Sequence, residues 1–174
     1  MPHLATFVFL KAALVAALWF ASGARAENVP GRFRLQDQFG TWHDVGFPRD
    51  RVIVLALADR QGSDQLEGWI DPLVERYPDR IDLQGVARLA GVPSLMRPAL
   101  RALFRRALDQ PVMMDWTGIV SDDFRYQQGV VNLLVITPAG RIDYRFNGVA
   151  SPEELIRCFE SIDRILEASV PREG

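Results

Sequence analysis

The segment Gly129-Val130-Val131-Asn132-Leu133-Leu134-Val135-Ile136-Thr137-Pro138-Ala139-Gly140-Arg141-Ile142 has the pattern of two strands joined by a tight turn. Its first half is almost wholly apolar, as is typical of a strand covered on both faces. Pro138-Ala139-Gly140 supplies turn residues, and Ile142, Tyr144 and Phe146 then alternate with polar residues. We therefore predict a β-hairpin formed by residues 130–136 and 141–149.

Upstream of this hairpin the sequence alternates between strand and helix patterns. Residues 52–58 are nearly all apolar and predict a buried central strand. Apolar residues then recur at helical spacing from 66 to 77, and Asp64 and Glu67 are spaced as a capping box. A helix is expected to start near Gln65, with a kink or break at Pro72.

The remaining strand signals are shorter. Residues 32–42 predict an N-terminal hairpin, and residues 80–87 and 111–114 predict two further strands. A turn is expected at 115–118, and Ser121-Asp122-Asp123 is expected to begin a short helical segment.

The C-terminal segment carries a strong helix signal. Ser151-Pro152-Glu153-Glu154 combines a capping box with proline in the first turn. Apolar residues at helical spacing follow as far as 168, and Cys158 lies on their face. We expect Cys158 to be an inert core residue, because a free cysteine in such a stripe behaves as a small hydrophobe.

A strand–helix–strand unit, a hairpin and a closing helix together predict an α/β domain with a central mixed sheet flanked by helices.

From about Phe33 to Leu166 the chain resembles the thioredoxin-like superfamily, in its redoxin branch, and most closely the YtfJ-like family of periplasmic proteins of unknown function. The resemblance rests on the 129–142 hairpin and on residues 58–63, 92–97 and 111–115 with Gly118. It implies a periplasmic location and no established catalytic residues. Relative to the smallest members of the superfamily, residues 86–110 are extra, which implies a helical insertion after the second core strand. Two marks of thioredoxin chemistry are absent: Val131 stands where the family places a cis-proline, and no C-x-x-C occurs in the chain. By position from the central strand, the resemblance places the two cysteines near Gly62 and Gln65, and neither side chain can substitute for a cysteine.

The resemblance places the loop after the central strand against the residues that precede the hairpin. Its implied binding edge comprises Arg60, Gln61, Ser63, Asp64, Val131 and Asn132. Arg60 and Ser63 would offer a cation and a hydroxyl to an anionic ligand or a peptide, with backbone N–H donors nearby. The alternative is that these residues only cap the helix and solvate the loop.

A second candidate surface is cationic. Arg97, Arg101 and Arg105 recur every fourth residue, and no acid lies between Asp82 and Asp109. Such a helix can contact an anionic membrane surface weakly or hold an acidic partner, or it can be an ordinary solvated face.

Other chemistries lack support in the sequence. A Ser63–His43 nucleophile pair is not favoured, because His43 falls in the N-terminal hairpin. Asp59, Asp64, Asp122 and Asp123 show no recognised metal-ligand spacing. We predict no catalytic residues, no metal and no cofactor.

The first 26 residues have the pattern of a secretory signal. Lys11 precedes an apolar run at 12–21, and Ala24-Arg25-Ala26 is a small-x-small cleavage site. Cleavage between Ala26 and Glu27 would leave one domain, 27–174, in the periplasm or outside the cell. Removing Lys11 and Arg25 from the 20 basic residues leaves 18 against 22 acids, which argues against nucleic-acid binding.

The sequence therefore predicts an exported, redox-inactive binding or accessory module of the cell envelope, which holds a protein partner or a small anionic ligand. The alternative is a redoxin-type thiol oxidoreductase or peroxidase that uses Cys158 or a cofactor not evident from the sequence. Partner identity and oligomeric state stay open.

Overall fold

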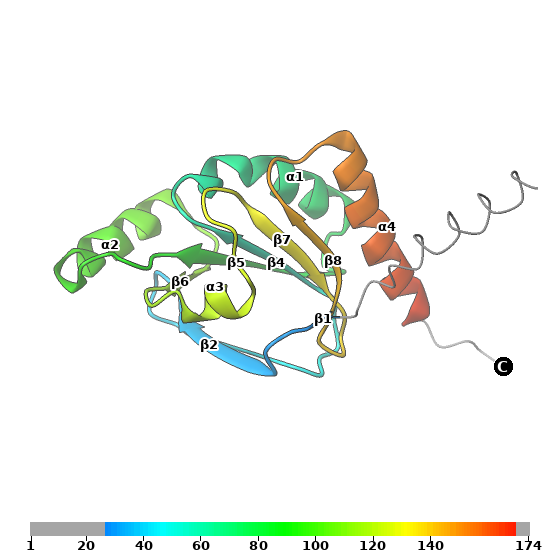
Figure 1. The fold of residues 1–174 in the computed structure, drawn as a ribbon, viewed down its shortest axis with the longest axis horizontal. Helices are drawn as coiled ribbons and strands as arrows, with labels where there is room; N and C mark the ends of the chain where they lie inside the picture. Colours follow the sequence, from blue (N-terminus) through cyan, green and yellow to red (C-terminus); the bar gives the residue numbers. More distant parts are fainter. Residues whose placement is uncertain (1–26, 170–174) are drawn as a thin grey trace, which may run out of the picture.

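The computed structural model describes residues 27–169 (Figure 1), so the expected signal segment, 1–26, lies outside the described residues. The chain forms a six-stranded mixed sheet in the order β1-β8-β7-β4-β5-β6 and a separate two-stranded hairpin, β2-β3. The strands are β1 (Glu27–Asn28), β2 (Arg32–Gln36), β3 (Trp42–Gly46), β4 (Ile53–Ala58), β5 (Asp82–Arg88), β6 (Val112–Asp115), β7 (Asn132–Ile136) and β8 (Arg141–Asn147). The helices are α1 (Glu67–Arg76), α2 (Arg97–Ala107), α3 (Ile119–Asp123) and α4 (Pro152–Ala168), with 3₁₀ turns η2 (Gly62–Gln65) and η3 (Ser94–Met96).

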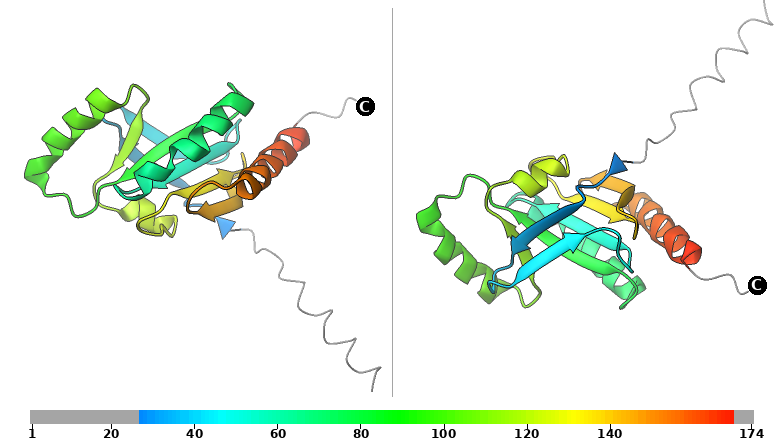
Figure 2. Two further views of the ribbon diagram at one scale, coloured as in Figure 1. Left: turned by 90° about the horizontal axis from the view of Figure 1, so that it is seen from above. Right: turned by 90° about the horizontal axis from the view of Figure 1, so that it is seen from below.

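Strand β4 is the centre of the sheet, as its apolar sequence predicts. It runs parallel to β5 and antiparallel to β7, and all six of its residues are buried. Each face of the sheet at β4 is covered by its own cluster of buried apolar residues. Helices α1 and α4 pack on one face, and the β2–β3 hairpin with α3 packs on the other (Figures 1 and 2).

The register of three strands shows which strand ends meet at one end of the sheet, which we call the edge. Leu57 in β4 lies opposite Asn132 in β7, and Asn132 lies opposite Asn147 in β8. The loop that leaves β4, the residues that enter β7 and the loop that leaves β8 therefore meet at this edge. Residues far apart in sequence are brought together there.

The predicted α/β layout and the helical insertion are confirmed, since α2 follows the second core strand, β5. The prediction of a capping box at Asp64 and Glu67 is wrong. The chain first makes the 3₁₀ turn η2, and α1 then starts at Glu67 without a side-chain cap. Helix α1 is also not broken at Pro72 but continues through it, and Trp69 and Leu73 on either side are both fully buried in the core.

The two remaining helix starts had different outcomes. Ser151 caps α4 as predicted, and its Oγ accepts a hydrogen bond from the Glu154 N–H at 3.2 Å. Ser121 does not cap α3, which begins after Gly118 in a left-handed conformation. The buried carboxylate of Asp115 instead accepts from the N–H groups of Gly118 and Ser121, both at 2.8 Å.

Candidate functional site

Gly62 occupies the position near which the resemblance places the first cysteine of a thiol pair. A Cβ atom built on Gly62 would lie 2.6 Å from both the carbonyl carbon and the oxygen of Val130, and 3.0 Å from the nitrogen of Val131. These obstacles are backbone atoms, which cannot move aside as a flexible side chain can. The space that a cysteine side chain would need is therefore filled by the segment leading into β7.

Asp59 connects the loop after β4 to the segment before β7. Its Oδ1 accepts hydrogen bonds from the N–H groups of Gln61 at 3.0 Å and Gly62 at 2.9 Å, and its Oδ2 accepts from the Gly129 N–H at 2.8 Å. Burial raises the pKa of this carboxyl, but these donors and Tyr126 outweigh it, so the pKa lies below the usual aspartate range. The chain's own carboxylate therefore occupies the anion position formed by these backbone donors.

The backbone N–H and C=O groups of Val131 also have hydrogen-bond partners within the chain. Its N–H donates to Gln65 Oε1 at 3.2 Å, and its carbonyl accepts from the Gly148 N–H at 2.8 Å. An extended peptide adds to a sheet by pairing with free backbone groups. At Val131 those groups are already used, so a peptide cannot pair with the Val131 backbone.

The six residues of the predicted binding edge divide into two sets. Arg60, Gln61, Ser63 and Asp64 are exposed. Val131 and Asn132 are buried, with exposed fractions of 0% and 1%. The Asn132 amide bonds to the backbone N–H and C=O of Gln127, at 2.6 and 2.8 Å. Val131 and Asn132 thus support the edge from beneath, and the exposed set alone faces solvent.

Ser63 and His43 have separate partners. Ser63 Oγ donates to the carbonyl of Arg60 at 2.7 Å. His43 Nε2 lies 2.8 Å from a carboxylate oxygen of Asp37 in the β2–β3 hairpin. Neither bond joins a serine nucleophile to a base.

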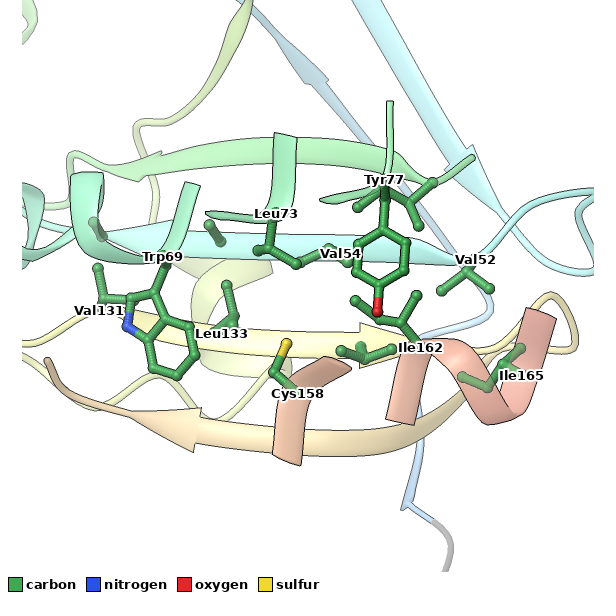
Figure 3. Packing of buried hydrophobic residues seen from close by; sticks show 14 residues of the cluster. Val52, Val54, Trp69, Leu73, Tyr77, Val131, Leu133, Cys158, Ile162 and Ile165 are labelled. Carbon is green, nitrogen blue, oxygen red and sulfur yellow. The ribbon is translucent and has the colours of Figure 1, made fainter. Parts of the chain in front are cut away.

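Cys158 lies in the core rather than at the edge. Its side chain comes from α4 and points among Leu73, Leu133 and Ile162 (Figure 3). It is 0% exposed, and burial raises the pKa of its thiol to about 12. Burial disfavours the thiolate, which is the reactive form of cysteine. The predicted core position of Cys158 is confirmed.

The predicted arginine stripe on α2 does not form one solvated face. The Arg97 guanidinium lies 5.4 Å from the ring centre of Trp116, and Arg101 donates to Gln36 Oε1 at 3.4 Å. Both side chains are half-buried against the body of the domain, whereas Arg105 is exposed. Residues spaced by four share a face, but here that face is turned partly inward.

Within residues 27–169, no three histidine, cysteine, aspartate or glutamate side chains gather as a set that could hold a metal ion. No helix in the same part of the chain has the length and apolar character needed to cross a membrane.

One residue at the edge was not predicted. Val149, in the loop after β8, is 65% exposed. The preceding Gly148 carbonyl accepts from Trp69 Nε1 at 2.9 Å, which holds this loop beside α1. Only the register of β7 and β8 places Val149 near the loop after β4, and no local sequence pattern shows that register.

Comparison with solved structures identifies the fold. The chain matches a candidate protein disulfide isomerase from Bacteroides thetaiotaomicron with a TM-score of 0.62 and 15% identity, over 82% of this chain and 89% of that one. An exposed lipoprotein thioredoxin, Etrx1 of Streptococcus pneumoniae strain TIGR4, matches with a TM-score of 0.59 and 13% identity, over 74% and 98%. An uncharacterized conserved protein from Geobacillus kaustophilus matches with a TM-score of 0.62 and 16% identity, over 86% of each chain.

No protein-family model and no curated protein matches the sequence. The structural matches confirm the thioredoxin-like fold that the hairpin predicted. The narrower resemblance to the YtfJ-like family stays a prediction.

Proposed function

We propose that this chain, which has the thioredoxin-like fold, is a redox-inactive module of the cell envelope that binds a partner protein. Its contact surface comprises the exposed side chains at the end of the sheet: Arg60, Gln61, Ser63, Asp64 and Val149. We call these five residues the edge surface. The observation that carries the proposal is the contact of Gly62 with the Val130–Val131 backbone, which leaves no room for a cysteine side chain at that position.

The chemistry of the edge surface favours a protein over a small anion. Backbone N–H donors of the loop are held by Asp59, so they are not free to bind an anionic group. What remains exposed is one cation, one carboxylate, an amide, a hydroxyl and an apolar side chain. Interfaces combine polar and apolar groups in this way, and such a balanced set offers no single strong charge for an ion.

The loop that carries these side chains is well anchored. Asp59 fixes it at Gly129, and Gln65 fixes it at Val131. A preformed surface loses less conformational entropy when it binds. This supports a recognition role for the edge surface, because these hydrogen bonds hold the loop that carries Arg60, Gln61, Ser63 and Asp64 in place.

We also propose export, with cleavage between Ala26 and Glu27. The small-x-small sequence at 24–26 supports it, and one structural neighbour is itself an exposed lipoprotein. Mass spectrometry of the soluble envelope fraction should find Glu27 at the N-terminus. Recovery of most of the protein with Met1 retained would refute processing.

The binding role is tested by site-specific photocrosslinking in the envelope. A photoreactive amino acid at Ser63 should capture one defined protein, and the same probe at Arg80 should not, because Arg80 precedes β5 and thus lies at the opposite end of the sheet. Arg60→Ala combined with Asp64→Ala should weaken that capture without lowering the melting temperature. Equal capture from both probe positions, or capture unchanged by the double variant, would refute the edge surface as the binding site.

The redox part of the proposal has its own test. Purified wild type and Cys158→Ser should show the same background rates in disulfide reduction and in peroxide consumption. Turnover that depends on the thiol and disappears in Cys158→Ser would instead support the redoxin-type enzyme.

A further inference from the structure

A second surface of the molecule lies on the arm formed by η3, α2 and Leu108, residues 94–108. None of the side chains of α2 is buried. The arm projects beyond the end of the sheet at β5 and β6 and lies away from α1 and α4 (Figures 1 and 2). Its C-terminal end is tied down by Gln38, whose amide donates to the carbonyls of Leu108 at 3.3 Å and Gln110 at 2.8 Å.

The two sides of the arm differ in what they contact. Arg97 and Arg101 lie on the side that faces the domain, where they reach Trp116 and Gln36. The other side presents large apolar groups to solvent: Leu95 is 90% exposed, and Met96 and Leu103 are each 59% exposed. Within α2, at 100° per residue, Leu103 lies about 140° around the helix from the mean direction of Arg97 and Arg101, and Leu95 and Met96 precede it in the 3₁₀ turn η3. These three side chains form an apolar strip that nothing in the described part of the chain covers.

Charge separates the arm from the rest of the protein. Residues 94–108 contain four arginines and no acid. Taking these four from the 20 basic residues of the chain leaves 16 against 22 acids. Arg105 and Arg106 are both exposed beside the apolar strip. The arm is therefore a cationic, partly apolar projection on an acidic body.

We propose that the arm docks the protein onto an anionic lipid surface. Leu95, Met96 and Leu103 enter the boundary between headgroups and acyl chains, while Arg105 and Arg106 contact the anionic headgroups. A helix with apolar residues on one side and arginines beside them suits this position. Attraction of the arm and repulsion of the acidic body together orient the protein with the arm toward the membrane.

A second copy of the chain fits this surface less well. A symmetric contact would place arm against arm and bring the two sets of Arg105 and Arg106 together. Like charges placed against each other disfavour association. An anionic lipid surface matches the sign of the arm's charge and accepts its convex shape.

The test uses sedimentation with vesicles. Wild-type protein should bind vesicles of phosphatidylglycerol and phosphatidylcholine, should not bind vesicles of phosphatidylcholine alone, and should be released by salt. Arg105→Gln combined with Arg106→Gln should lower the partition coefficient, by about fivefold for each arginine lost. Leu95→Ser combined with Leu103→Ser should also weaken binding while leaving its salt dependence in place.

The matched control is Arg51→Gln combined with Arg80→Gln, which removes the same charge from exposed positions before β4 and β5. This variant should bind as wild type does, and all three double variants should melt normally because they change surface positions. Absence of wild-type binding, or equal losses in the control and the arm variants, would overturn the proposal. If the wild-type protein forms a dimer that Leu103→Ser dissociates, the apolar strip belongs to a contact with a second copy. If the arm binds an acidic protein in a salt-sensitive way and does not bind vesicles, the strip belongs to that partner. Either result overturns the lipid assignment.

Discussion

Replacing Gly62 by alanine tests directly whether the Val130–Val131 backbone leaves room for a side chain at this position. The added methyl carbon would lie 2.6 Å from the carbonyl carbon and oxygen of Val130. To accommodate it, either η2 or the segment entering β7 must move. That movement would disturb the hydrogen bonds from Gly62 and Gly129 to Asp59. The substitution therefore acts as overpacking against backbone.

The expected size follows from comparable cases. Overpacking a well-packed site costs about 1–3 kcal/mol. For a domain near 150 residues this corresponds to a fall in melting temperature of roughly 2–12 °C. Thermal unfolding followed by circular dichroism measures it. The glycine is not required for its conformational freedom, since its φ lies outside the left-handed region, so the loss would report the close approach alone.

Gly68→Ala supplies the matched control. Gly68 lies in the first turn of α1, and a Cβ there would be 3.4 Å from the Ala150 methyl carbon, which is ordinary van der Waals contact. Alanine also favours helix over glycine by up to about 1 kcal/mol. The control should therefore melt at or above the wild-type temperature. If Gly62→Ala does the same, the backbone does not fill this position and the argument against a thiol site fails.

Three further predictions concern neighbouring groups. Cys158, with its thiol buried and its pKa raised to about 12, should resist a thiol reagent at neutral pH and react fully once the protein is unfolded in denaturant. The pKa of Asp59 is lowered, so its carboxylate stabilises the folded protein fully above the pKa of an unfolded aspartate, about 3.9, and this stability is lost as pH falls through the lower folded pKa. Asp59→Asn should remove that part of the acid dependence of the melting temperature. An unchanged dependence on pH would contradict the prediction. Gln65→Leu should cost about 1 kcal/mol by removing the acceptor of the Val131 N–H, and an unchanged melting temperature would show that this bond contributes nothing.

Sequence reasoning succeeded where the deciding interaction is local. Ser151 and Glu154 are three residues apart, so a capping pattern could predict the start of α4. The apolar run of β4 predicted a strand covered on both faces. The turn at Pro138 to Gly140 fixed the β7–β8 hairpin, and with it the fold. Each of these signals lies within one element or between neighbours in the chain.

Sequence reasoning failed where the partner is distant. Asp59 and Gly129 are 70 residues apart, and no local pattern indicates that one accepts a hydrogen bond from the other. The sequence therefore predicts Asp64 as the helix cap, whereas in the structure the carboxylate of Asp59 holds the loop by hydrogen bonds. The same limit applies to α2. A spacing of four places Arg97 and Arg101 on one face, but only the positions of Trp116 and Gln36 show that this face turns toward the domain.

The hydrogen bonds around Asp59 oppose a reactive cysteine at this site. A reactive cysteine needs backbone N–H donors to stabilise its thiolate and needs space for its side chain. Here the Asp59 carboxylate holds the N–H groups of Gln61, Gly62 and Gly129, and the Val130–Val131 backbone fills the space at Gly62. Restoring a cysteine alone would supply neither requirement, since the loop would also have to release Asp59 and move away from β7. The interactions that exclude a thiol are the same ones that hold the exposed side chains of the edge surface in position, which is why we assign this edge to binding.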